Sequence, residues 1–210
     1  MTVTSALLSF SVVAVFLTII PGLDTALVLR SAIAQSRRHA IVTALGINTG
    51  ALVWGAAAAV GATALLAAST LADDGLRIAG ALYMIYLGAM MLWRTRSRAA
   101  VPEAGRAPAS EPLWRAFARG ATTNLLNPKV GAFYLAVIPQ FVPANSNHLL
   151  MGLALAMVHN LVSVFWFAGL IGSAHLARRW LSKDSVRGWI DRVTGVVLVG
   201  FGVKLAASRA

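Results

Sequence analysis

Residues 4–29 of this chain read TSALLSFSVVAVFLTIIPGLDTALVL. Residues 4–23 carry no charge, and Asp24 then follows shortly after Pro21. A helix needs roughly 20 apolar residues to cross about 30 Å of hydrocarbon. This stretch therefore predicts a transmembrane helix that is interrupted near Pro21. Because the run lacks the preceding Lys or Arg of a cleaved signal peptide, we expect the helix to be retained.

Five further apolar runs follow, near residues 41–68, 76–93, 117–138, 149–174 and 189–207. The 210 residues are 58% hydrophobic and 12% charged, which is too little charge to cover a water-facing surface. Only helices and closed barrels satisfy their backbone in lipid, and these runs have helical length. We therefore expect an all-α integral membrane protein with six transmembrane helices.

Basic residues gather in alternate loops of this arrangement. Fourteen of the 18 Lys and Arg residues lie between helices 1 and 2, 3 and 4, or 5 and 6, or at the adjoining helix ends: Arg30, Arg37, Arg38, Arg94, Arg96, Arg98, Arg106, Arg115, Arg119, Arg178, Arg179, Lys183, Arg187 and Arg192. The positive-inside rule places these loops in the cytoplasm and both termini on the periplasmic side of a bacterial inner membrane. The net charge of +11 is thereby explained by topology and the lipid bilayer, not by nucleic acid.

The longest polar connection divides the chain into two halves of three helices. We expect one membrane domain made of residues 1–98, a cytoplasmic linker at residues 99–115, and residues 116–210. Because three is odd, the second half enters the membrane inverted with respect to the first. Glycine-rich faces could pack inside one chain or between two, so a homo-oligomer stays open.

The first helix of each half carries a proline beside a charged residue. Helix 1 has Pro21 and Gly22 next to Asp24, and helix 4 has Pro128 next to Lys129. Proline removes a backbone donor and clashes with the preceding turn, so we expect helices 1 and 4 to be broken there. Paired interrupted helices in inverted halves indicate a transporter's substrate site.

Two charged residues lie within the predicted helices at these breaks. Asp24 can carry a proton or bind a substrate ammonium, and it can also cap the half-helix that follows Gly22. Lys129 can pair with Asp24, bind a substrate carboxylate, or neutralise carbonyl groups exposed at the break. A site with one Asp and one Lys suits a zwitterionic amino acid.

Three amide residues complete the candidate substrate or proton site: Asn127, Asn48 and Asn160. Asn127 can also bond the backbone groups that Pro128 frees. Asn48 lies between Gly46 and Gly50, whose spacing favours close helix packing. His159 stands alone in its helix, and the chain has no cysteine, so we expect neither a metal nor a cofactor.

The chain resembles the lysine/threonine exporter family (LysE/RhtB type) over nearly its whole length. The likeness is carried by residues 17–25 (LTIIPGLDT), residues 79–88 (AGALYMIYLG), and Arg119-Gly120 leading into residues 124–129 (NLLNPK) and 138–141 (IPQF). This resemblance implies a secondary exporter of amino acids or their derivatives, driven by the proton motive force. By motif match it places Pro21, Gly22, Asp24, Asn127, Pro128 and Lys129 in the two family signatures.

We therefore expect a proton-coupled exporter that is not an enzyme. No phosphate-binding loop, zinc-protease motif or serine-hydrolase motif occurs in the sequence. A metal or cation exporter is one alternative, but it needs several converging oxygen, nitrogen or sulfur ligands. A membrane-embedded enzyme or assembly factor is another, and it would turn over a bound compound without net movement across the bilayer.

Overall fold

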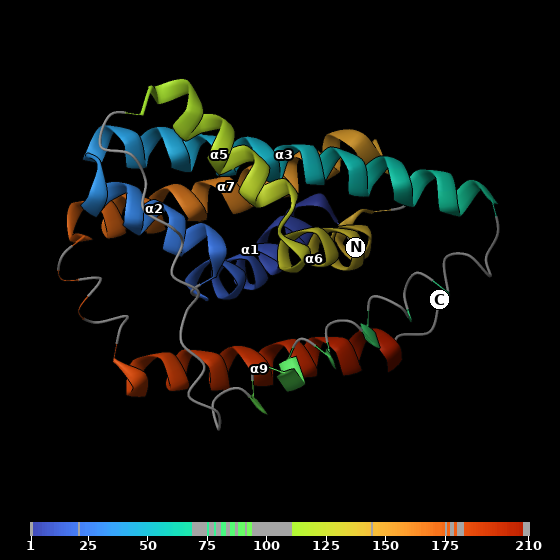
Figure 1. Cartoon of the computed structure of the whole chain (residues 1–210). Coiled ribbons are helices and arrows are strands. Elements are labelled where there is room, and N and C mark those ends of the chain that lie inside the picture. Colours follow the sequence, from blue (N-terminus) through green and yellow to red (C-terminus); the bar gives the residue numbers. More distant parts are fainter. Residues whose placement is uncertain are drawn as a thin grey trace.

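A computed structural model describes residues 2–20, 22–68, 111–143, 145–174 and 183–207, with isolated positions at 75–93, 176 and 179. The described residues form helices and turns without strands. The elements are α1 (Val3–Ile19), α2 (Leu23–Ala34), α3 (Arg37–Ala68), α5 (Leu113–Leu125), α6 (Pro128–Val137), the 3-10 helix η1 (Ile138–Phe141), α7 (His148–Gly172) and α9 (Asp184–Ala207). Figure 1 shows that most of them run along one direction of an elongated bundle.

The helices begin where polar side chains can cap them. Thr2 accepts a hydrogen bond from the backbone amide of Ser5 at the start of α1. Asn147 accepts one from the backbone amide of Leu150 at the start of α7. Such caps satisfy amide groups that have no partner inside the first turn.

Both predicted helix breaks are present. α1 ends at Ile19 and α2 starts at Leu23, with a bend of 56° between their axes. α5 ends at Leu125 and α6 starts at Pro128, where the absent proline amide costs no helical hydrogen bond. Gly22 is the N-cap residue of α2, whereas Pro21 lies outside the described residues.

Glycines bring α3 close to its neighbours. A Cβ atom at Gly46 would overlap the carbonyl oxygen of Phe117 on α5, and one at Gly120 would overlap that of Thr43 on α3. A Cβ atom at Gly50 would lie 2.7 Å from Oδ1 of Asn124. The packing role expected for Gly46 and Gly50 is therefore observed, and it brings the α5–α6 break against the middle of α3.

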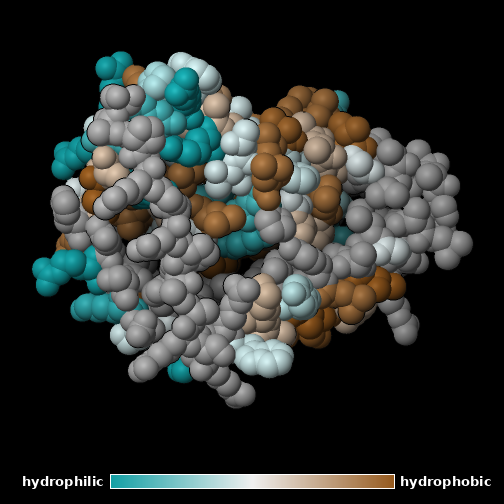
Figure 2. Space-filling view, viewed as in Figure 1, coloured by the Kyte–Doolittle hydropathy of each residue, from teal (hydrophilic) through white to brown (hydrophobic). Residues whose placement is uncertain are grey.

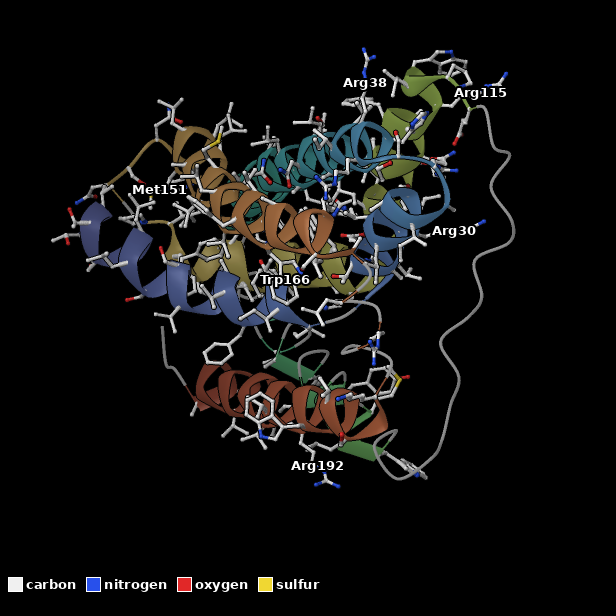
Figure 3. All side chains as sticks on the ribbon, turned by 90° about the vertical axis from the view of Figure 1, so that its left-hand side faces the viewer. Arg30, Arg38, Arg115, Met151, Trp166 and Arg192 are labelled. Carbon is white, nitrogen blue, oxygen red and sulfur yellow. The ribbon has the colours of Figure 1, made fainter. Side chains whose placement is uncertain are left out.

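The described parts of the three basic loops lie at one end of the bundle. Gln35, after α2, donates to Glu111 at 2.9 Å, and Glu111 forms an ion pair with Arg119 of α5 at 2.8 Å. α9 starts at the same end, on the left in Figure 1. Hydrophilic residues gather at that end in Figure 2. Figure 3, in which that end faces the viewer, shows Arg38 and Arg115 at the top and Arg30 below them.

Large apolar side chains cover much of the outer surface. Leu8, Val53, Leu161, Phe165 and Val203 are all at least half exposed. In water this surface would be costly, but hydrocarbon solvates it well. The outward faces of α1, α3, α7 and α9 are therefore suited to contact lipid.

Two described helices are long and apolar enough to cross a membrane, α3 over Arg37–Gly61 and α7, and a third span results if α1 and α2 are counted together. Most of the third predicted helix, residues 76–93, and most of the linker at 99–115 lie outside the described residues. The six-helix arrangement and the two inverted halves therefore remain predictions for the complete chain.

Candidate functional site

A small cavity lies where the two helix breaks meet. Its volume is about 40 Å³, which is room for about three water molecules. Residues of α1, α2, α3, α5, α6 and α7, or of the breaks between them, form its wall: Leu17, Thr18, Ile20, Gly22, Asp24, Thr25, Ile47, Asn48, Ala51, Asn124, Asn127, Lys129, Val130, His159, Ser163 and Phe167. Four of the five predicted site residues are in this wall, and Asn160 is not.

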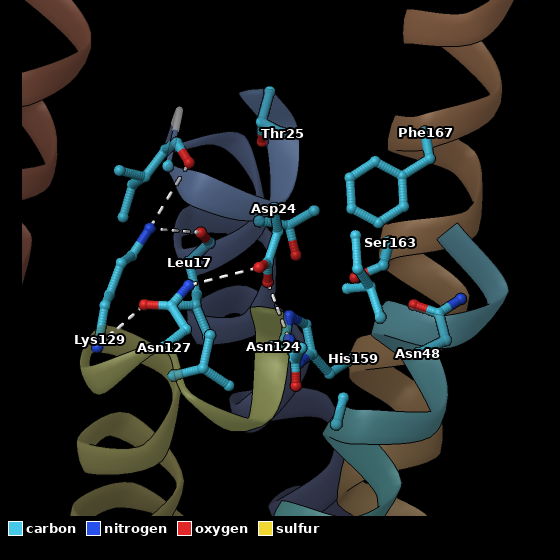
Figure 4. A pocket seen from close by; sticks show the side chains of 16 residues that line it. Leu17, Asp24, Thr25, Asn48, Asn124, Asn127, Lys129, His159, Ser163 and Phe167 are labelled. Carbon is cyan, nitrogen blue, oxygen red and sulfur yellow. Dashed lines mark hydrogen bonds between the residues drawn. The ribbon is translucent and has the colours of Figure 1, made fainter. Parts of the chain in front are cut away.

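Asp24 is held by two amide groups from the opposite break. It lies in the first turn of α2, where the helix dipole favours a negative charge. Nδ2 of Asn124 donates to its Oδ2 at 2.8 Å, and Nδ2 of Asn127 donates to its Oδ1 at 3.4 Å. Figure 4 shows both amides pointing at the carboxylate. The arrangement fixes one acidic group at the cavity wall with its orientation defined.

Asn127 serves both breaks. Its Oδ1 accepts a hydrogen bond from the backbone amide of Lys129 at 3.1 Å and so caps the start of α6. Its amide nitrogen is the one that reaches Asp24. Asn127 therefore bonds the backbone at the start of α6 and also contacts Asp24.

Lys129 makes the reverse connection, from the second break to the first. Its Nζ donates to the carbonyl oxygens of Leu17 and Ile20, each at 3.5 Å. These carbonyls are at the C-terminal end of α1, where helical partners are missing and the dipole favours a cation. Of the roles considered for Lys129, neutralisation of exposed carbonyls is the one these contacts provide.

Asn160 and Asn48 join α7 to α3. Nδ2 of Asn160 donates to the backbone oxygen of Asn48 at 2.9 Å, and both side chains are buried. Asn160 therefore lies behind the cavity wall. Its hydrogen bond fixes how α7 and α3 are aligned at the point where Asn48 lines the cavity. The expectation that Asn48 faces the site agrees with this placement.

The predicted site residues did not include several contributors to the site, among them Asn124, Tyr134, Ser163 and Phe167. Tyr134 of α6 is fully buried and its hydroxyl lies 2.7 Å from Nδ1 of His159. Ser163 and Phe167 follow His159 at intervals of four, so the three residues share one face of α7. That helical spacing is the signal that could have identified them. His159 is hydrogen-bonded to Tyr134. The described residues hold no group of three or more potential metal ligands from His, Cys, Asp and Glu.

Several proteins are similar to this chain. The "Uncharacterized membrane protein YrhP" of Bacillus subtilis (strain 168) is 30% identical over 208 residues, 97% of this chain and 99% of that protein. The "Threonine efflux protein" of Escherichia coli (strain K12) is 29% identical, with 90% of this chain and 91% of that protein covered. The "Leucine efflux protein" of Enterobacter sp. (strain 638) is 29% identical, with 95% and 94% covered. No solved structure matches.

The family comparison covers almost the same length. The family model described as "LysE type translocator" matches residues 15–209, which include both helix breaks and the whole cavity. This agrees with the resemblance carried by the two sequence signatures and with the apolar helices of the fold. It also assigns the protein to a transporter class and not to the enzymes. The chain belongs to the LysE type translocator family and is a multi-pass protein of the bacterial membrane.

Proposed function

We propose that this protein exports amino acids or amino-acid derivatives from the cytoplasm and that protons moving inward drive the export. The observation that carries the proposal is Asp24, a carboxylate oriented by two asparagine amides in the wall of a cavity between two helix breaks. Relatives that are named threonine and leucine efflux proteins support the substrate class.

Asp24 is the coupling group in this proposal. A proton and the ammonium group of a substrate both bind a carboxylate, and each neutralises its charge, so they compete for Asp24. Release of the substrate to the periplasm leaves the carboxylate open to a proton, and loss of that proton to the cytoplasm restores the substrate site. One charge crossing about 150 mV provides about 3.5 kcal/mol, which sustains a gradient of two to three decades.

Lys129 supplies the second charge that an amino acid needs. Its ammonium group lines the same cavity as Asp24, so the carboxylate of a zwitterion can approach Lys129 while its ammonium approaches Asp24. Binding then replaces bonds from the ammonium group to the neutral α1 carbonyls by an ion pair in which both partners are charged. We propose that this exchange loosens the contact between the two breaks.

The size of the cavity implies movement. The cavity has room for about three water molecules, and an amino acid is larger than that. The helices must therefore separate before a substrate enters. The two breaks can act as hinges because the helical backbone is interrupted there. Lys129 donates to the Ile20 carbonyl and Asn127 donates to Asp24, so these two bonds hold the breaks together until they are exchanged. We propose alternating access in which α1–α2 and α5–α6 move against each other.

The test uses proteoliposomes that contain a mixture of labelled amino acids and have a more acidic solution outside. We expect wild-type protein to release a subset of them faster when the pH gradient is present. Asp24→Asn keeps the shape of the side chain but cannot bind a proton, so this variant should insert normally and lose gradient-driven export.

Glu111→Gln is the matched control, since it also exchanges a carboxylate for an amide but lies outside the cavity. Its ion pair with Arg119 is at the end of the bundle, and a glutamine side chain has the same shape and still accepts a hydrogen bond from the guanidinium group. Export should therefore persist. Wild-type rates for Asp24→Asn would show that another group couples transport to protons.

A further inference from the structure

Asn48 presents an unsatisfied acceptor at the cavity. The residue is only 8% exposed, and its Oδ1 has no hydrogen-bond partner in the part of the chain that the structure describes. Its backbone oxygen is already bonded to Asn160, which leaves the side chain free to serve another partner. A buried acceptor without a donor is unfavourable, so this oxygen calls for a donor from whatever occupies the cavity.

The face of α7 across the cavity from Asn48 changes from polar to aromatic along the helix. Nδ1 of His159 is engaged by the Tyr134 hydroxyl, which fixes the orientation of the imidazole ring. Ser163, one turn later, adds a buried hydroxyl that can donate or accept. Phe167, one turn further, closes the wall with a ring that is 5% exposed. The wall is therefore polar at His159 and Ser163, and the aromatic ring of Phe167 closes it one turn further along α7.

These groups lie apart from the two charges. Figure 4 shows Lys129 at one side of the cavity, Asp24 between, and Asn48, Ser163 and Phe167 at the other side. An α-amino acid also has three groups around one carbon: a carboxylate, an ammonium and a side chain. With its charged groups at Lys129 and Asp24, its side chain is directed between α3 and α7.

We infer that Asn48 and Ser163 form the subsite for the substrate's side chain and select a short side chain that bears a hydroxyl group. The inference rests on the proposed export of amino acids through this cavity. A substrate hydroxyl donates to Oδ1 of Asn48 and accepts from the hydroxyl of Ser163. A methyl group in the same place leaves both protein groups without partners, and Phe167 restricts longer side chains.

Threonine and valine test the inference because they differ only by a hydroxyl in place of a methyl group. Export of each from proteoliposomes gives a ratio of initial rates at equal, low concentration. An unsatisfied buried group costs about 1–3 kcal/mol, so wild-type protein should favour threonine by roughly 5- to 150-fold. Asn48→Leu, which is close in shape but cannot hydrogen-bond, should bring the ratio to within about threefold of one.

Thr49→Val is the matched control. It removes a hydroxyl from the next residue of α3, but Thr49 is exposed and bonded to the carbonyl of Leu45, outside the cavity wall. The threonine preference should therefore be unchanged. Ser163→Ala is a smaller substitution that serves if Asn48→Leu does not insert, and it should lower the preference severalfold.

The outcomes separate this inference from the proposed function. Failure of wild-type protein to export any amino acid would contradict the proposed function itself. Export of threonine and valine at equal rates would overturn only the inference, because water would then satisfy Asn48. A threonine preference that survives in both Asn48→Leu and Ser163→Ala would overturn it as well.

Discussion

The ammonium group of Lys129 lies where α1 ends, although the residue itself belongs to the first turn of α6. A positive charge at the start of its own helix is unfavourable, and the long side chain places that charge at the C-terminal end of another helix, where the dipole favours it. Asp24 has the opposite sign and stays in the first turn of its own helix. Each charge therefore stabilises a helix end while lining the cavity.

Replacement of Lys129 by methionine distinguishes substrate binding from helix stabilisation. If Lys129 binds the substrate carboxylate, Lys129→Met should raise KM for a zwitterionic amino acid by roughly 10- to 150-fold, as expected for a hydrogen bond to a charged group. KM for a simple amine that lacks the carboxylate should change less than threefold. Initial rates over a range of concentrations provide both values.

Lys183→Met provides the comparison, because Lys183 is exposed at the start of α9 and does not line the cavity. It should leave both KM values unchanged. An equal rise in KM for the amino acid and for the amine in Lys129→Met would assign Lys129 to the helix break alone.

At the scale of elements, the contact between α3 and α5 decides where the second break lies. Gly120 meets the backbone of α3, and a rigid backbone atom cannot move aside as a flexible side chain can. Gly50 similarly makes space for Asn124. The glycines therefore position the amide of Asn124 against Asp24, although they have no polar side chain.

A methyl group at this crossing should be destabilising. Gly120→Ala forces α3 and α5 apart and should lower the free energy of unfolding by about 1–3 kcal/mol, the range for overpacking. Thermal unfolding in detergent measures the loss as a lower Tm. The Asn124 to Asp24 contact is also displaced, so export should fall.

Gly169 of α7 provides a control, because unlike Gly120 it has space for a methyl group. A Cβ atom there has no other atom within 4 Å, so Gly169→Ala adds helix propensity without a clash. Its Tm should stay equal or rise, in line with a gain of up to about 1 kcal/mol. A similar Tm for the two variants would contradict the proposed role of the α3–α5 contact.

At the scale of the whole molecule, the charged end of the bundle predicts its orientation. The described basic residues of loops 1–2 and 3–4 lie at the end of the bundle where α9 also begins. The positive-inside rule therefore predicts that all three loops lie on the same side of the membrane. We expect this end to face the cytoplasm and the turn before α7 to face the periplasm.

The absence of cysteine makes this orientation directly measurable. Asn145→Cys in the turn before α7 and Ala34→Cys at the end of α2 both introduce a thiol at an exposed position. A membrane-impermeant maleimide should label the first in intact spheroplasts and the second only after permeabilisation. The reverse pattern would invert the topology and the direction of transport.

Much of this protein could be predicted from the order of its residues. Apolar length and proline position are local properties, because a helix needs a certain span to cross lipid and proline lacks an amide hydrogen wherever it occurs. The breaks before Leu23 and Pro128 therefore lie where the sequence indicated. Asp24 and Lys129 stood out for the same reason, since a charge within an apolar run needs a partner.

Tertiary structure alone decided which partners these groups have. Asn124 and Asp24 are 100 residues apart, and their contact depends on the rotation of α5 and on its close approach to α3. The same geometry put Asn48 in the cavity wall and Asn160 behind it, although both are buried amides. Helix rotation results from the packing of many side chains at once, and no short stretch of sequence contains that information.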